Sequence, residues 1–475
     1  MRRPTSGEAA ALAAAAASLA FQLFVPPRVG LADNGDFNRV MGAFGLSAPP
    51  GPDRYFTYFI PRYAFDLKDV VSVPFVSSQK LLVAVAVGLH RLFRGRGAEF
   101  DIAFLAAVNA LALLAALWVL MVAARGGPAS RRWTTLVLLV VVFTDVGYAA
   151  YLNSFYSEPA SLVFLLAATG FLLLALGQPR LRVLAAAALC MVLLVAAKPQ
   201  NFAAAPPLAA LALRLLVLRK DARWRAACAA TGAATLATAL LVFARGNPVG
   251  VRENAMQVSV FYALLGDSPD PRADLAELGL PPKLAGLAGL HPWSVEMPPR
   301  EDPRFRRQFF GRMTTGRLLG FYARHPRRLW GVVDRVVARG AFHSRPPLGN
   351  YEQATGRPPL AQSPAFAWWG RLRGRLAPRS LAGALSVFGL LLAGSGVLYA
   401  RQGREGRLRI ELLWAIAAVG LGQLLVVALA AGAIDAVKHM FLFKATVDLS
   451  LVATLGWLAG AVSAAAARRR PASAA

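Results

Sequence analysis

The stretch that decides the fold is DIAFLAAVNALALLAALWVLMVA, residues 101–123. Beyond Asp101 it holds no charged residue, and a helix needs roughly 20 apolar residues to cross the hydrocarbon core of a bilayer. Comparable runs recur along the chain at 9–25, 133–149, 159–177, 182–198, 202–218, 226–244, 380–399, 410–431 and 441–463. Since lipid offers backbone groups no hydrogen bonds, these runs predict an all-α polytopic membrane bundle of about 10 transmembrane helices.

Composition agrees with a chain that is embedded in a membrane. Of the 475 residues, 56% are hydrophobic and 16% are charged, and the mean hydropathy is +0.48. The net charge of +27 comes from arginines in short loops and in one long loop, which suits lipid headgroups better than nucleic acid. Cys190 and Cys228 both lie in apolar runs, so they predict neither a metal site nor a disulfide framework.

The distribution of positive charge predicts the topology. The run 77–93 is short and has polar ends, so it is interpreted as a juxtamembrane or re-entrant helix. The run 9–25 is interpreted as an uncleaved first transmembrane helix rather than a signal peptide. With the N-terminus in the cytoplasm, both termini are inside and every predicted inner segment is basic, through Arg125, Arg131, Arg132, Arg180, Arg182, Arg219, Lys220, Arg223, Arg225, Arg401, Arg404, Arg407, Arg409, Arg468, Arg469 and Arg470.

This topology divides the chain into three parts. An N-terminal transmembrane module, residues 1–245, includes a long first external loop at 26–100. Residues 246–379 form an external loop subdomain, with helical stretches predicted near 252–265 and 304–340. Residues 380–475 carry the last transmembrane helices. The arginine series in the second stretch favours one interfacial amphipathic helix that holds lipid phosphates over a dedicated substrate site.

Unusual polar residues gather in loops that face the same outer compartment. They are DNGDF at 33–37, YLNSFYSEP at 151–159, KPQN at 198–201, REN at 252–254 and DAVKHM at 435–440. Each has a plainer explanation: a solvated turn for the acid pair, a helix cap for Glu158, a snorkelling side chain for Lys198 and a helix-end imidazole for His439. Ionisable groups at a bilayer are costly, so five such clusters together favour a functional site.

This set of residues suits inverting glycosyl transfer from a lipid-linked sugar. The reaction needs a carboxylate to take the proton of the acceptor hydroxyl, and Asp33 or Asp36 could supply it. It also needs cations around the departing phosphate, for which Lys198, Lys438, His439 and Arg252 are the candidates. No glycine-rich phosphate loop, HExxH metal motif or GxSxG motif is present in the sequence.

At this point the chain resembles the GT-C class of polytopic glycosyltransferases, and most closely the bacterial hexose transferases of glycan biosynthesis. The resemblance is carried by 32–37, 153–158, 198–200 and 439–443, and by SVFY at 259–262, DSP at 267–269, ELGL at 277–280 and His325-Pro326. It covers nearly the whole chain.

The resemblance implies several roles. The donor is a polyprenyl-phosphate-linked sugar, the acceptor is a cell-envelope glycan or lipid, and the enzyme lies in the bacterial inner membrane. The catalytic base falls on Asp36 or Asp33, with Asp36 preferred. Glu158 helps to place the acceptor or a metal, and members of the class differ in whether they bind a divalent metal ion. The substrate-binding residues are Glu158, Tyr156, Lys198, Gln200, Arg252, Lys438 and His439.

Three other functions remain alternatives at this stage. A transporter or lipid flippase would have internal repeats and charges near the midplane, whereas the charges here lie at helix ends. An envelope polymer ligase would depend on Arg and His more than on an acid pair. A non-enzymatic scaffold would tolerate replacement of the outer acids.

Overall fold

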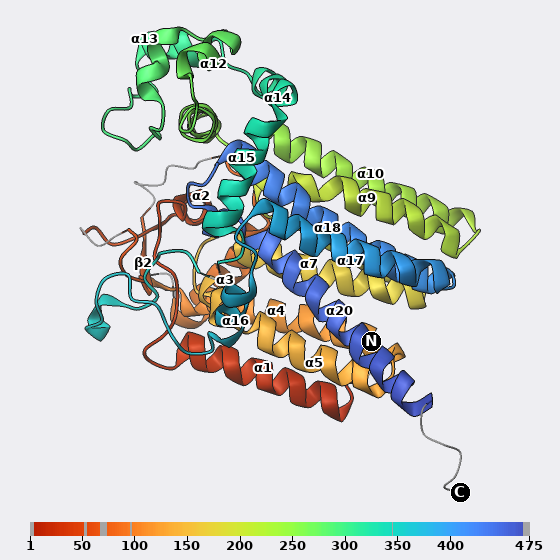
Figure 1. Cartoon of the computed structure of the whole chain (residues 1–475). Helices are drawn as coiled ribbons and strands as arrows, with labels where there is room; N and C mark the ends of the chain where they lie inside the picture. Colours follow the sequence, from red (N-terminus) through yellow and green to blue (C-terminus); the bar gives the residue numbers. More distant parts are fainter. Residues whose placement is uncertain (1–3, 52–54, 67–73, 96, 344, 469–475) are drawn as a thin grey trace, which may run out of the picture.

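Most of the long helices run side by side in one bundle (Figure 1). The computed structural model describes residues 4–51, 55–66, 74–95, 97–343 and 345–468, so Arg469 and Arg470 of the predicted basic tail lie outside the described residues. The bundle consists of α1 (Ser6–Phe24), α4 (Ala103–Ala123), α5 (Ala129–Phe143), α6 (Val146–Leu152), α7 (Glu158–Gly177), α8 (Leu181–Val195), η4 (Pro199–Ala204), α9 (Ala205–Arg214), η5 (Leu215–Leu218), α10 (Ala222–Arg245), α17 (Leu381–Arg401), α18 (Arg404–Ala430) and α20 (Phe441–Arg468).

Each of the predicted spans coincides with helix, but one of them is too short to cross a bilayer alone. Within the described residues, 8 helices are long and apolar enough to span, or 9 if α5 and α6 count as one bent span. The remaining segment, predicted at 182–198, is α8 with 15 residues. It ends at Val195 because Pro199 follows, and because Lys198 turns away to pair with Glu158.

The bend between α5 and α6 has a local cause. The two helices meet at 59°, and the Asp145 carboxylate accepts a hydrogen bond of 2.8 Å from the Gly147 amide at the start of α6. The carbonyl of Thr144, which the break frees, accepts a hydrogen bond of 2.9 Å from the Gln22 side chain of α1. Interruptions of a membrane helix require such replacement partners.

The doubtful run at 77–93 is a surface helix. It forms α3 (Gln79–Arg94), which packs against α4 on one face. The exposed face carries a stripe of large apolar side chains, namely Leu81, Val85, Leu89, Leu92 and Phe93. Its 16 residues and its two-sided character suit a helix lying along the membrane surface, and the juxtamembrane or re-entrant placement stays a prediction.

The first external loop also contains the small amount of sheet. Strands β1 (Leu46–Ser47), β2 (Arg62–Phe65) and β3 (Phe100–Asp101) form an antiparallel sheet in the order β1-β2-β3. Leu46 lies opposite Phe65, and Arg62 lies opposite Asp101. The short helix α2 (Asn38–Met41) precedes the sheet.

The second long loop forms a cap of short helices. They are α11 (Val249–Gln257), η6 (Val258–Leu264), α12 (Pro271–Glu277), η7 (Pro282–Leu287), α13 (Pro303–Phe305), η8 (Arg306–Phe310), α14 (Thr315–Arg324), α15 (Pro326–Val336), η9 (Val337–Ala341), η10 (Gln353–Thr355) and α16 (Trp368–Leu376). Of these, α12, α13 and α14 lie at the top of Figure 1, while α15 and α16 lie closer to the bundle. The core of the cap continues into α17 and α18. Boundaries at 245 and 380 therefore remain a prediction.

The arginine series does not lie on one continuous helix, and its placement at the membrane interface stays a prediction. The series is divided among α13, η8, α14 and α15, which surround a core that includes Phe305 and Phe321. α14 ends at His325 because Pro326 follows it, and the proline ring makes a helical backbone unfavourable for the residue before it. Several of the arginines pair with acids of the cap itself, for example Arg328 with Asp274 at 2.6 Å.

Candidate functional site

Four connections meet at one end of the bundle and bring the predicted polar residues together. They are the loop after α1, the turn between α6 and α7, the turn between α8 and η4, and the turn that carries α19 (Ala436–His439) before α20. These segments are far apart in the sequence but meet in space. Lys438 pairs with Asp36, and Asn34 bonds to Asp435. The predicted inner loops lie at the other end, where Arg404 bonds to the Val217 carbonyl and Arg219 to that of Pro179.

Asp33 stabilises the turn that carries Asp36. Its Oδ1 accepts hydrogen bonds from the amides of Gly35 (2.8 Å) and Phe37 (3.1 Å), and Gly35 has a φ of 97° that favours glycine. Asp33 is 2% exposed, and its Oδ2 has no hydrogen-bond partner among the described residues. Burial raises the pKa of Asp33 to about 6.

Asp36 is the more accessible acid and is held by two cations. Its side chain is 19% exposed, its Oδ1 lies 2.8 Å from Arg39, and its Oδ2 pairs with the Lys438 ammonium. Burial opposes ionisation, but the charges of Lys438 and Arg39 outweigh it and hold the pKa of Asp36 well below its usual value. Asp36 is therefore ionised in this structure.

Lys438 is the centre of a charge cluster that consists of Asp36, Arg39, Asp435, Lys438 and the neighbouring pair of Glu158 and Lys198. It is 1% exposed, contacts Asp435 at 3.0 Å as well as Asp36, and lies 5.1 Å from the centre of the Tyr156 ring. Burial lowers its pKa, yet Asp36 and Asp435 raise it more, so the net shift is upward. The Tyr156 hydroxyl donates to the Ala32 carbonyl at 2.9 Å and so fixes the ring beneath the ammonium.

A second pair lies beside the first. Lys198 donates a 2.7 Å hydrogen bond to Glu158, and both side chains are almost fully buried. Gln200 donates to the His439 carbonyl at 2.8 Å, and its Oε1 lies 3.3 Å from His439 Nδ1. Burial, then the charges of Lys198 and Lys438, lower the pKa of His439, so its imidazole is neutral at neutral pH.

Arg252 is the predicted site residue that the structure leaves outside this cluster. It lies on α11 with an exposed side chain, which donates to the Ala244 carbonyl at 3.2 Å. Within the described residues, no hydrogen bond or ion pair joins it to Asp36, Lys438 or Lys198. The other predicted residues are gathered at one place, because each lies in a turn at the same end of the bundle.

Several contributors were missed in the sequence. Arg39 follows Asp36 by three residues on the same turn, so spacing was a usable signal for it. Asp435, three residues before Lys438, was recognised in the stretch 435–440 but was given no role. Lys444 was hidden in the apolar run of α20. Its ammonium donates to the carbonyls of Val437 (2.7 Å) and His343 (2.8 Å), and so supports the turn that carries Lys438.

A buried cluster around Asp448 was also missed. Its Oδ2 pairs with Arg373 of α16 and accepts hydrogen bonds from Tyr148 (2.6 Å) and Trp369 (2.9 Å). Asp448 is 0% exposed, and its position inside a predicted span was the available signal. These contacts attach α16, and with it the end of the cap segment, to α20.

The charge cluster does not offer a ligand set for a divalent cation. In the part of the chain that the structure describes, no group of three or more His, Cys, Asp or Glu side chains is arranged to hold a metal ion. Asp36 faces two cations, and Glu158 faces Lys198.

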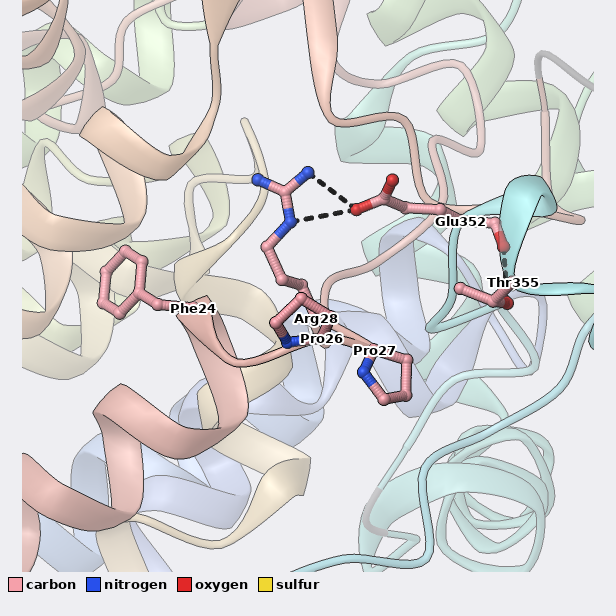
Figure 2. Close-up of a pocket in the computed structure, with 6 residues that line it drawn as sticks. All are labelled: Phe24, Pro26, Pro27, Arg28, Glu352 and Thr355. Atoms are coloured by element: carbon pink, nitrogen blue, oxygen red, sulfur yellow. Dashed lines mark hydrogen bonds and ion pairs between the residues drawn. The ribbon is translucent and has the colours of Figure 1, made fainter.

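A pocket of about 370 Å³ lies where the chain leaves α1 (Figure 2). It is lined by Phe24, Pro26, Pro27, Arg28, Glu352 and Thr355. Figure 2 shows the Arg28 guanidinium facing the Glu352 carboxylate, at 2.8 Å. This ion pair joins the end of α1 to the returning segment of the cap, and no charge-cluster residue lines the pocket.

The fold is that of a polytopic helical membrane protein, and a family model gives its class. The chain belongs to the family described as the YfdI N-terminal transmembrane domain, whose model matches residues 5–473. This family is GT-C-like, so the class expected from the sequence is confirmed. No curated protein sequence matches the chain.

Solved structures of an archaeal oligosaccharyltransferase are similar to the chain. One is AglB from Archaeoglobus fulgidus in complex with an inhibitory peptide and a dolichol-phosphate, with 15% identity, a TM-score of 0.42, and coverage of 99% of this chain and 53% of that one. Another is the apo form of the A. fulgidus enzyme, with 15% identity, a TM-score of 0.42, and coverage of 98% and 52%. The chain thus spans about half the length of these proteins.

Proposed function

We propose that the chain transfers a hexose, with inversion, from a polyprenyl-phosphate donor to a cell-envelope glycan or lipid acceptor. The reaction would take place on the outer face of the bacterial inner membrane, with both termini in the cytoplasm. The family supports a GT-C-type glycosyltransferase. The observation that carries the finer proposal is the partly exposed carboxylate of Asp36, held between Arg39 and the buried Lys438.

Asp36 fits a base better than Asp33 does. A general base must come within hydrogen-bonding distance of the hydroxyl whose proton it takes. Asp36 has an exposed edge, whereas Asp33 is buried and already accepts two backbone amides. We therefore assign Asp36 as the base and Asp33 as the residue that positions its turn.

The donor phosphate would activate this base by taking its cations. Without a donor, Lys438 and Arg39 keep the pKa of Asp36 low, so its carboxylate is a weak base. A phosphate bound beside them would attract both cations, because phosphate and carboxylate compete for the same donors. Asp36 would then bind a proton more readily when donor and acceptor are both in place.

In the transfer step the acceptor proton passes to a carboxylate oxygen of Asp36. The acceptor oxygen forms a bond to the anomeric carbon, from the face opposite the phosphate, and the bond from that carbon to the phosphate oxygen breaks. The electron pair stays on the phosphate, whose growing charge Lys438 and Lys198 stabilise. Gln200 and the neutral His439 bond to each other and are partly exposed, so their remaining polar capacity would bind sugar hydroxyls.

The proposal is tested with purified protein and radiolabelled undecaprenyl-phosphate hexoses, offered together with envelope lipid and glycan fractions. Wild type is compared with Asp36→Asn and with Glu301→Gln, whose carboxylate is 70% exposed on the cap. Transfer by wild type and Glu301→Gln, with none by a folded Asp36→Asn, supports the proposal. Turnover by Asp36→Asn equal to wild type would overturn the assignment of the base.

A further inference from the structure

A second cavity lies at the opposite end of the bundle, far from the charge cluster. It encloses about 380 Å³ between the end of α9 and the connection from α17 to α18, and its polar lining comes from Arg214, Arg404, Arg407, Tyr399 and Gln402. The 27 residues of α18 separate it from the turn that carries Lys438. At 1.5 Å per residue the separation is about 40 Å, close to the full thickness of a membrane.

The positive charge of this cavity is only partly balanced. Arg214 donates two hydrogen bonds of 2.8 Å to Glu411, so one of the three arginines is neutralised. Arg404 and Arg407 bond to backbone carbonyls, those of Val217 (3.4 Å) and Tyr399 (3.2 Å). Within the described residues neither of these two has a carboxylate partner, so the cavity keeps an excess of positive charge.

Two further features of the lining favour an anion. Arg407 lies over the Tyr399 ring at 5.4 Å, which holds its guanidinium in place beside the cavity. The helix α18 begins here, and its N-cap residue Gly403 has no side chain to bond the amides of the first turn. Those amides are therefore available to an anion, together with the guanidinium groups.

The cavity borders the apolar outer surface of the bundle. Close to its lining along the chain lie Leu213, Val217, Val397 and Leu398, large apolar side chains that are between 42% and 57% exposed. In a membrane these side chains contact lipid tails. A phospholipid could place its headgroup in the cavity while its tails follow this surface, which a soluble phosphate ester cannot do.

We infer that this cavity binds the phosphate of an anionic phospholipid. Basic pockets between membrane helices bind such headgroups elsewhere, through the same combination of guanidinium groups and an open side towards lipid. The plainer explanation is that the arginines only orient the chain in the membrane, which requires charge but no cavity. The inference is independent of the proposed transferase activity.

The test compares wild type, Arg404→Gln with Arg407→Gln, and a control with Arg182→Gln and Arg223→Gln, which removes two exposed arginines from other predicted inner loops. Each purified protein is placed in micelles with phosphatidylcholine alone, with added phosphatidylglycerol, or with added inorganic phosphate. Thermal unfolding and the amount of bound lipid, from native mass spectrometry, are recorded. Equal unfolding temperatures in phosphatidylcholine establish that the variants fold.

We expect phosphatidylglycerol to stabilise wild type and the control. In the cavity variant the apparent Kd should rise at least about tenfold, because each of the two arginines removed supplies a charged hydrogen bond. Equal stabilisation of all three proteins would overturn the inference, because the arginines would then act only as general positive charge. Stabilisation by inorganic phosphate alone, as large as that by the lipid, would overturn the lipid as the occupant.

Discussion

Two of the ion pairs at the charge-cluster end of the bundle, Asp36 with Lys438 and Asp448 with Arg373, differ in how accessible their carboxylates are. The pair of Asp36 and Lys438 shares its charge with Arg39 and Asp435, and the Asp36 carboxylate is 19% exposed. The pair of Asp448 and Arg373 is closed, since their side chains are 0% and 7% exposed. Tyr148 and Trp369 donate to the same carboxylate oxygen that Arg373 contacts.

This difference in accessibility suits Asp36 and Lys438 to a reactive site, and Asp448 and Arg373 to a contact that holds helices together. A charge with several partners and an open side can exchange one partner for a ligand at little cost. A charge enclosed on all sides stabilises the contact between helices, and removal of one member leaves the other unpaired in a medium of low dielectric constant. We therefore expect substitutions at the first pair to change activity, and substitutions at the second to change stability.

The largest expected effect is on activity, at Asp36. The Asp36→Asn variant keeps the size of the side chain but cannot accept the acceptor's proton, so turnover should fall about 10³-fold. Radiolabel transfer measures the loss, and thermal unfolding verifies the fold. A turnover within threefold of wild type would place Asp36 with Asp448, as a residue of the scaffold.

Next comes a loss of stability at Arg373. Arg373→Met leaves the buried Asp448 without its cation, which should reduce the free energy of unfolding by about 3 kcal/mol or more. Denaturation in detergent measures it. Adding Asp448→Asn should recover at least half of the loss, because the unpaired charge is gone while Tyr148 and Trp369 keep an acceptor. No recovery would show that the charge itself is unimportant.

The raised pKa of Asp33 should make the free energy of unfolding depend on pH. Because burial raises its pKa to about 6, the folded state holds a proton that the unfolded chain releases near the usual pKa of an aspartate. Stability from this group is therefore full at low pH and is lost as the pH rises through 6. Between about pH 4.5 and pH 7, wild type should lose about 2 kcal/mol relative to Asp33→Asn.

The measurement is thermal unfolding of both proteins across that range. Asn can still accept the amides of Gly35 and Phe37, so the turn is preserved and other titrating groups cancel in the difference. A constant difference between the two proteins would show that the Asp33 carboxyl titrates at its usual value, and that its environment is wetter than the structure shows.

The smallest expected effect is at Lys198. Lys198→Gln removes the cation that Glu158 faces and one that we place near the donor phosphate. Because Glu158 is then buried without its cation, the variant should also lose stability, so turnover is measured on the folded protein. The loss of one charged hydrogen bond should raise the KM for the donor about tenfold, and kcat should fall as well, because Lys198 also faces the charge that grows on the leaving phosphate. A fall in kcat with an unchanged KM would assign Lys198 to the transition state alone.

The sequence was informative about helices and less so about their partners. Long uncharged runs such as 101–123 must be helical in lipid, so their number and order could be predicted. The sequence did not show that proline and a long-range ion pair end the helix predicted at 182–198 early, nor that the arginine series packs around its own core. Both outcomes depend on contacts between residues far apart in the chain.

What the sequence alone determined is which residues lie at the same end of the bundle. Spans that alternate in direction place Asp36, Glu158, Lys198 and Lys438 at one end, whatever the packing. Only the tertiary structure decided that Asp36 meets Lys438, that Asp33 turns inward and that Arg252 stays outside. The physical reason is that helix direction follows from local hydrophobicity, whereas side-chain pairing depends on how the helices pack.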